Sequence, residues 1–208
     1  MASSTASYRL SVLVLAGGQS RRMGRDKARL VVQGEPLILR VVRRVKRVAD
    51  EVLVVSRWPH EYAFTGVACV PDVFPGQGPL AGIWSGALVA AGRYIAPVAC
   101  DMPFVNPNLL QAMVDTLETR PRLEGILPVE GERAHPLHGV YHRQAFLKAG
   151  AQALRKGQRA IQAALDHMRL EVWSKARWGT WEPAGHAFWN LNTPEDLRRL
   201  LQEKGNAP

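Results

Sequence analysis

The stretch Arg9-Leu10-Ser11-Val12-Leu13-Val14-Leu15, which ends at Ala16-Gly17-Gly18, decides how the rest of the chain is interpreted. It is a short, almost uninterrupted apolar run, typical of a strand that is buried on both faces of a parallel sheet. Comparable runs follow at residues 51–55, 67–70 and 94–100. The first half of the chain therefore predicts at least four buried strands.

Helical patterns lie between these runs. Residues 37–48 carry apolar side chains at a helical period, residues 79–91 form a second apolar segment, and Asn106-Pro107 is a start signal for a helix that runs to Thr119. Further strands are expected at residues 125–129, 137–141 and 170–173, and further helices at residues 145–155, 161–168 and 193–202. The alternation predicts one three-layer α/β domain over residues 1–208, with a mostly parallel, Rossmann-like sheet and flexible ends at 1–8 and 204–208.

Composition excludes several classes of protein. With 208 residues, 47% of them apolar, the chain is long enough to bury a core without disulfides or structural metals. Two cysteines are too few for a disulfide framework, and the first seven residues have neither the basic nor the apolar region of a signal peptide. We therefore expect a soluble cytoplasmic protein that does not interact with a membrane.

The net charge of +9 is concentrated in one segment. Residues 21–47 hold ten Lys and Arg residues against only Asp26 and Glu35, a net of +8. The segment is either an adventitious basic face or a site for an anionic ligand. Within it, the helical period places Arg40, Arg43, Arg44 and Arg47 on one face, which we expect to be a solvated surface.

The loop after the first strand, residues 15–27, combines a glycine pair with basic side chains. Backbone N–H groups of such a loop can close on a phosphate while the basic side chains supply countercharge. The loop has neither the Gly-Lys-Ser/Thr ending of a Walker A motif nor the glycine spacing of a dinucleotide-binding fingerprint. A polar turn with chance arginines remains the alternative.

Two carboxylates follow predicted strands. Asp101, at the tip of the strand over residues 94–100, stands where Mg²⁺ would be held beside substrate phosphates, or it begins a turn before Met102-Pro103. Asp72 follows the strand over residues 67–70 and, taken alone, is a solvated loop carboxylate.

The loop has a more specific parallel. Its sequence, Leu15-Ala16-Gly17-Gly18-x-Ser20-x-Arg22-Met23-Gly24-x-Asp26-Lys27, closely resembles the signature of the molybdenum cofactor guanylyltransferases. Three further motifs of that family follow in the same order along the chain: Gly78-Pro79-Leu80-Ala81-Gly82, Cys100-Asp101-Met102-Pro103, and Asn190-Leu191-Asn192-Thr193-Pro194-Glu195-Asp196-Leu197. The resemblance covers the chain from Leu10 to about Leu201 and implies the fold of the nucleotide-diphospho-sugar transferases.

The resemblance also implies roles for individual residues. The nucleotide-binding residues would be Leu15, Ala16, Gly17, Gly18, Lys27, Asp72, Pro79, Leu80 and Asp101. The catalytic residues would be Arg22, Lys27, Asp101 and Asn192, and Asp101 would bind Mg²⁺, for which Mn²⁺ could substitute. Ser56 stands where the family usually has an asparagine, which leaves one nucleotide contact open.

The activity that the resemblance implies is transfer of GMP from GTP to the terminal phosphate of molybdopterin, with release of pyrophosphate. Partners would be GTP, molybdopterin or the molybdenum cofactor, and the enzymes that deliver or accept it. The alternatives are a CTP-dependent molybdopterin cytidylyltransferase and another small nucleotidyltransferase. A basic nucleic-acid-binding module has no recognised motif behind it, since aromatic residues do not interleave with the arginines.

Two residue clusters receive no catalytic role from the sequence. His135, His138 and His142 are close in sequence, but on a strand His135 and His138 would face opposite sides, so we expect a surface strand rather than a metal site. The tryptophans of the last third are expected to pack in the core or on the surface, with stacking on a pterin as the minor alternative; they are Trp173, Trp178, Trp181 and Trp189.

Overall fold

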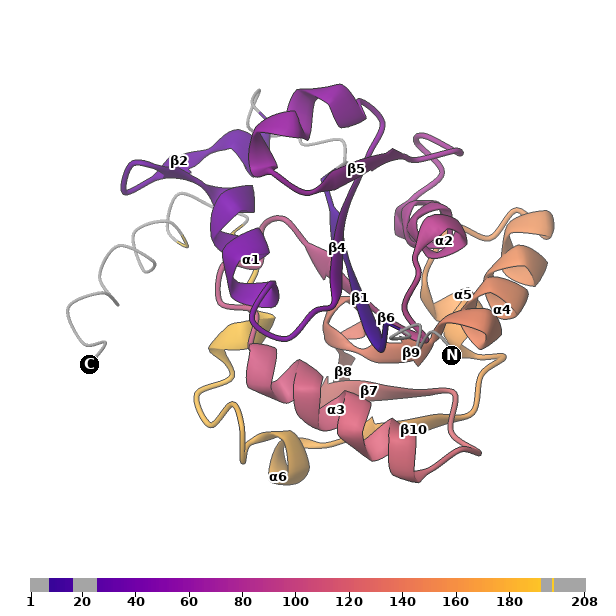
Figure 1. The fold of residues 1–208 in the computed structure, drawn as a ribbon. Helices are drawn as coiled ribbons and strands as arrows, with labels where there is room; N and C mark the ends of the chain where they lie inside the picture. Colours follow the sequence, from indigo (N-terminus) through magenta and orange to yellow (C-terminus); the bar gives the residue numbers. More distant parts are fainter. Residues whose placement is uncertain (1–7, 17–25, 192–195, 197–208) are drawn as a thin grey trace, which may run out of the picture.

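The computed structural model describes residues 8–16, 26–191 and 196, and its centre is a mixed sheet (Figure 1). Within these residues the sheet has eight strands in the order β10-β7-β9-β6-β1-β4-β5, with β8 paired to β7. The strands are β1 (Leu10–Leu15), β4 (Glu51–Ser56), β5 (Ala68–Pro71), β6 (Tyr94–Ala99), β7 (Gly125–Glu130), β8 (Arg133–Ala134), β9 (Val140–His142) and β10 (Leu170–Trp173). A separate hairpin joins β2 (Val31–Val32) to β3 (Glu35–Pro36).

The first strand lies in the middle of this sheet, as its continuous apolar sequence requires. Leu13 of β1 is in parallel register with Leu53 of β4 on one side and with Pro97 of β6 on the other. Strand β5 is parallel to β4, and β10 is parallel to β7, while β9 runs antiparallel between β6 and β7. The prediction of a mostly parallel sheet is confirmed.

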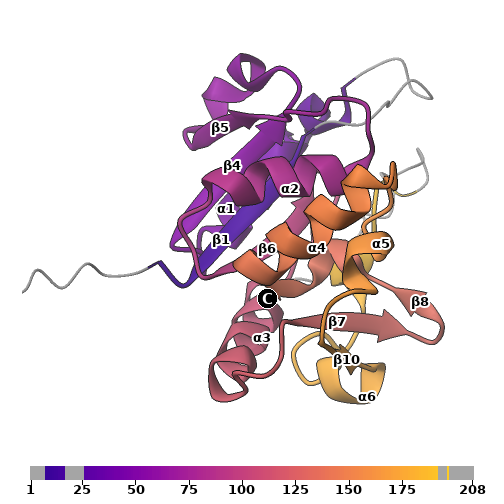
Figure 2. The same ribbon diagram turned by 90° about the vertical axis from the view of Figure 1, so that its right-hand side faces the viewer.

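Helices cover both faces of the sheet, which gives three layers (Figures 1 and 2). One face packs against α1 and α3, and the other packs against α2, α4 and α5. Val12 and Val14 of β1 point into the first of these two cores and Leu13 points into the second, since side chains alternate along a strand. The helices are α1 (Leu37–Val45), α2 (Pro79–Val89), α3 (Pro107–Thr119), α4 (Arg143–Arg155), α5 (Gln162–Leu165) and α6 (Lys175–Trp178).

Most expected elements are present, with shifted ends. The helix expected over residues 37–48 ends at Val45, and the one expected over residues 161–168 is only the four residues of α5. Asn106 caps α3 as predicted, since its side-chain oxygen accepts from the backbone N–H groups of Asn108 and Leu109. The final helix expected over residues 193–202 lies outside the described residues apart from Asp196.

The strand expected over residues 137–141 is wrong at its start. Residues Pro136–His138 form the 3-10 turn η3, and β9 begins only at Val140. Because of this turn, His135 and His138 do not face opposite sides. Both contact the ring of Phe188, with ring centroids 4.2 Å and 5.2 Å away. His138 is fully buried, so the expected surface strand is replaced by an aromatic core.

The tryptophans pack mainly in the core, as expected. Trp173 and Trp178 are fully buried, and the ring of Trp181 stacks on Trp173 with centroids 5.4 Å apart. Trp189 is 38% exposed and lies beside His186. Across the described residues, the structure contains no helix long and apolar enough to cross a membrane.

Burial of His138 makes stability depend on pH. Burial lowers the pKa of this imidazole to about 3, against an ordinary value of about 6.5. Below pH 6.5 the His138 imidazole binds a proton in the unfolded chain but stays neutral in the folded chain. The free energy of unfolding therefore falls as the pH drops from about 6.5 towards 3. We expect His138 to lower the free energy of unfolding by about 2 kcal/mol between pH 6.5 and pH 5, because each pH unit contributes about 1.4 kcal/mol.

Urea unfolding at pH 7 and pH 5 measures this effect. A His138→Leu variant should lose most of the difference between the two pH values, even if it is less stable at pH 7. Burial also lowers the pKa values of the buried His135 and the half-buried His142, which act in the same direction and leave a smaller residual slope in the variant. Equal slopes in the variant and the parent would contradict this assignment.

Candidate functional site

The carboxyl ends of β1, β4, β5 and β6 meet at one edge of the sheet, because these strands are parallel. Backbone hydrogen bonds hold the segments that leave this edge side by side. The N–H of Ala16 donates to Val55, and the N–H of Cys100 donates to Leu15. Ligands of open α/β sheets bind at such an edge. At this edge the chain brings together three segments to which the sequence analysis assigned site residues.

Asp101 follows β6 directly at this edge. Its carboxylate Oδ2 lies 3.7 Å from Nζ of Lys27, and each of the two side chains is less than one-fifth exposed. Burial raises the pKa of the Asp101 carboxyl, and the nearby Lys27 ammonium partly offsets that rise. The backbone carbonyl of Asp101 accepts from Leu191, 90 positions later in the chain. The structure therefore brings two predicted catalytic residues into one ion pair.

Local contacts position Lys27. It opens the 3-10 turn η1 (Lys27–Arg29), and Asp26 caps that turn by accepting from the N–H of Ala28 at 3.0 Å. The other carboxylate oxygen of Asp26 accepts from the Tyr62 hydroxyl at 2.7 Å. Sequence reasoning assigned Tyr62 no role. The capping pattern at Asp26 was readable from the sequence, but a contact across 36 positions carried no local signal.

Asp72 stands at the same edge, after β5. Its N–H donates to the carbonyl of Ser56 at 2.9 Å, and its Oδ1 accepts from the N–H of Phe74 at 3.0 Å. The first turn of α2 lies against it, since a Cβ added at Gly82 would be 3.8 Å from both Asp72 Oδ2 and Leu15 Cδ2. Asp72 and Leu15 thus flank the start of the same helix. The side chain is half-buried and is not the fully solvated carboxylate that its position alone suggested.

Pro79 and Leu80, at the start of α2, differ in how exposed their side chains are. Pro79 is exposed at the first helical position and has no N–H to donate. The side chain of Leu80 is fully buried, and its N–H faces the carbonyl of Arg159 at 3.4 Å. Arg159 therefore lies against this loop, from a segment to which the sequence assigned no function. Any contact between Leu80 and a nucleotide would involve its backbone.

Gly78 is required at the start of α2. Its φ is +85°, and an added Cβ would lie 2.9 Å from the Arg159 carbonyl oxygen. Gly76 has a similar φ of +82° but open space around it, so it is a matched control. We expect Gly78→Ala to destabilise the fold by about 1–3 kcal/mol more than Gly76→Ala does, because overpacking adds to backbone strain. Urea unfolding of both variants checks this, and equal losses would mean that the close approach of Arg159 is relieved without cost.

Ser56 ends β4 and is 3% exposed. Its hydroxyl oxygen accepts from the N–H of Trp58 at 3.1 Å, and its carbonyl accepts from Asp72. Ser56 thus stabilises the turn after β4 and the position of Asp72. The nucleotide contact that an asparagine would make at this position stays open.

Several predicted site residues lie outside the described part of the chain. They are Gly17, Gly18, Arg22 and Asn192. Asn190 is described, and the hydrogen bond from Leu191 to Asp101 brings the beginning of its motif to the same sheet edge. The structure thus gathers Leu15, Ala16, Lys27 and Asp101 with Asp72 beside them.

The donor set at this edge fits one kind of metal site. Within the described residues, no group of three or more His, Cys, Asp or Glu side chains could hold a metal ion by itself. Mg²⁺ is commonly held by one or two carboxylates together with substrate phosphates and water. The half-buried carboxylate of Asp101 is compatible with that arrangement.

Comparison with known proteins shows the family of the chain. The model of the MobA-like NTP transferase domain matches residues 12–170. The chain belongs to this family. The MobA-like chain is 35% identical over 199 residues to a probable molybdenum cofactor guanylyltransferase from Nostoc sp., covering 93% of this chain and 91% of that one. It is 31% identical to a molybdenum cofactor guanylyltransferase from Desulfosudis oleivorans, covering 90% and 92%.

A solved structure supports the fold of the MobA-like chain. Molybdopterin-guanine dinucleotide biosynthesis protein A from Archaeoglobus fulgidus superposes with a TM-score of 0.80 at 23% identity, covering 95% of this chain and all of that one. The expected fold of the nucleotide-diphospho-sugar transferases is confirmed. The MobA-like chain is therefore a nucleotidyltransferase, with the sheet edge of Lys27 and Asp101 as its candidate active site.

Proposed function

We propose that this MobA-like transferase joins GMP from GTP to the terminal phosphate of molybdopterin. An oxygen of that phosphate attacks the α-phosphorus of GTP, the bond from the α-phosphorus to the bridging oxygen breaks, and pyrophosphate leaves with the electron pair. The product is molybdopterin guanine dinucleotide. Since the attacking oxygen is already anionic, no general base or covalent enzyme intermediate is needed. The protein has to position two anionic substrates and neutralise their charge.

Each predicted residue has a role in this proposal. Leu15, Ala16 and the backbone of Gly17 and Gly18 bind the nucleotide together with Asp72, Pro79 and Leu80. Lys27 and Arg22 neutralise phosphate charge, and Asn192 contacts the reacting phosphates. Lys27 is supported by its half-buried place at the sheet edge and by the capped turn that fixes its backbone.

Asp101 is the proposed ligand of Mg²⁺, with Mn²⁺ as a substitute. When bound, the ion would supply positive charge to the phosphate oxygens of GTP. The carboxylate has to be ionised to hold it. The Lys27 ammonium favours this ionised form against the effect of burial. The Asp101–Lys27 pair thus keeps one negative and one positive group ready for the cation and the phosphates.

Similarity to two relatives supports GTP and molybdopterin as the substrates. Both relatives are named as molybdenum cofactor guanylyltransferases, and each match covers about nine-tenths of both chains. The test mixes the purified protein with Mg²⁺, molybdate-loaded molybdopterin and either GTP or CTP. Mass detection of the guanine dinucleotide with GTP alone is the expected result. The cytosine dinucleotide would keep the mechanism and overturn the base assignment. No product with either nucleotide would overturn molybdopterin as the acceptor.

The proposed reaction also defines where the protein works and with what. We propose a cytoplasmic enzyme that receives molybdopterin or the molybdenum cofactor from a delivering enzyme and passes its product to an acceptor enzyme. Relatives named for molybdenum cofactor synthesis support this place in metabolism. Nucleic acid has no part in the proposal.

A further inference from the structure

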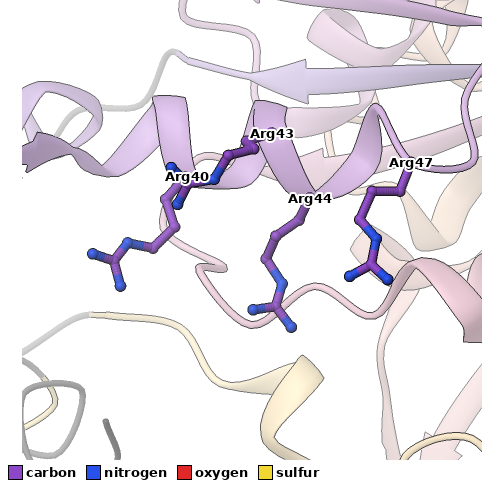
Figure 3. A pocket seen from close by; sticks show the side chains of 4 residues that line it. All are labelled: Arg40, Arg43, Arg44 and Arg47. Carbon is purple, nitrogen blue, oxygen red and sulfur yellow. The ribbon is translucent and has the colours of Figure 1, made fainter. Parts of the chain in front are cut away.

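A second cluster of basic residues lies on α1 and on the turn that follows it. Arg40, Arg43, Arg44 and Arg47 line a pocket of about 340 Å³. Figure 3 shows the side chains of Arg40, Arg44 and Arg47 extending to the same side of the helix. Arg40 and Arg44 are one helical turn apart on α1, and Arg47 follows in the turn after the helix. The sequence predicted these arginines on one face but expected that face to be solvated.

That expectation is wrong for two of the four side chains. Arg40 is only 7% exposed, because the β2–β3 hairpin covers it and the carbonyl of Val32 accepts from its Nη2 at 3.2 Å. Arg44 is half-buried, and its Nε donates to the carbonyl of Val105 at 3.0 Å. Burying an arginine costs desolvation energy, so a face made of such residues needs compensation.

One buried polar atom in the pocket lacks a hydrogen bond. Nε of Arg40 is buried, and no hydrogen-bond acceptor meets it within the described residues. The nearest carboxylate oxygen, Oε2 of Glu35, is 3.8 Å away, and Glu35 is already bound by both terminal nitrogens of Arg43 at 2.7 Å and 2.9 Å. Buried N–H donors are seldom left unpaired in native proteins. Arg40, one of the residues that line the pocket, therefore carries a buried donor that has no acceptor in the part of the chain that the structure describes.

Like charges also lie close together in this pocket. The carboxylate of Glu35 pairs with Arg40 and Arg43, and Glu182 interacts with Arg44 at longer range. Glu182 is itself committed to hydrogen bonds from the Asn106 side chain and the His186 backbone. Burial and the neighbouring arginines lower the pKa of the Arg44 guanidinium. The four guanidiniums of the pocket thus repel one another, which makes their close spacing costly.

We propose that this pocket binds a phosphate group, either free or as the monoester of a small molecule, independently of the nucleotide site. A phosphate dianion would offset the mutual repulsion of these guanidiniums. Guanidiniums recognise phosphate through paired N–H donors, and Nε of Arg40 supplies a donor in the interior. The volume of about 340 Å³ accommodates a small molecule that carries one phosphate.

The test is titration calorimetry of the full chain with inorganic phosphate and with glycerol phosphate, at constant ionic strength. We expect saturable binding of one equivalent. The double variant Arg44→Gln/Arg47→Gln should weaken binding at least ~10-fold, because it removes two charge-assisted contacts. A double variant of exposed residues at the end of α4, Arg155→Gln/Lys156→Gln, has the same change of net charge and should bind like the parent.

Three results would overturn the proposal. They are absence of saturable binding by the parent, parent-like binding by the α1 variant, and loss of this binding in a Lys27→Ala variant, which would assign the phosphate to the nucleotide site. If the double variant fails to fold, Arg47→Glu changes only an exposed side chain and should still weaken binding. Binding of only one of the two ligands identifies the source of the phosphate, and either one supports the site. Because binding is measured without nucleotide, failure here leaves the guanylyl-transfer proposal intact.

Discussion

Replacing Asp101 with asparagine should lower the rate of guanylyl transfer at least ~100-fold while leaving the protein folded. Asparagine keeps the shape of the side chain and removes its charge. The backbone contact from Leu191 goes to the Asp101 carbonyl and is unaffected by the substitution. The variant therefore isolates the carboxylate as ligand of the cation and partner of Lys27.

Product formation at saturating Mg²⁺ and GTP measures the loss, and urea unfolding measures folding. Asp166→Asn is the matched control, because Asp166 is an exposed carboxylate beyond α5 whose contact is with Gln162. The control should keep parent activity. Near-parent turnover in the Asp101 variant would show that the cation is held elsewhere.

Replacing Lys27 with methionine should also cost at least ~100-fold in rate, because the ammonium that neutralises phosphate charge is lost. A second effect distinguishes this role from a structural one. Lys27 lowers the pKa of the Asp101 carboxyl, so its removal raises that pKa. The residual activity should therefore need a higher pH than the parent's before Asp101 ionises, and the acidic limb of the pH–rate profile moves upward.

The profile is measured for the parent, for Lys27→Met and for Lys148→Met, in which an exposed lysine of α4 is changed. The Lys148 variant should match the parent in rate and in profile. A Lys27 variant whose rate falls without any movement of the acidic limb would contradict the electrostatic coupling with Asp101. Unchanged activity would remove Lys27 from the site.

The sequence predicted the fold well where burial and periodicity act together. The apolar run that became β1 needed two buried faces, and its central place between β4 and β6 satisfies that need. Asp72 and Asp101 were singled out because they follow strands whose ends meet at one edge, and the resemblance to a family then gave Asp72 its role. These inferences depend on local composition and on the geometry that all parallel sheets share.

The sequence failed where distant contacts override local pattern. Apolar periodicity continued to Val48, but α1 ends at Val45. The face of Arg40 looked solvated because its burial depends on the β2–β3 hairpin, two strands of two residues each that leave no periodic signal. The hydroxyl of Tyr62 donates a hydrogen bond to the Asp26 carboxylate from another part of the chain, and the sequence around either residue does not indicate this contact.

The hydrogen bond from Leu191 to Asp101 has a consequence for biosynthesis. Asp101 follows β6, but the segment that supports its backbone comes after β10 in the chain. Leu191 also packs with Val32 and Leu37, next to the turn that carries Lys27. During translation the sheet can assemble strand by strand, whereas this support for the catalytic edge is absent until residue 191 has left the ribosome. A nascent chain that already holds the complete sheet is therefore not yet an assembled enzyme.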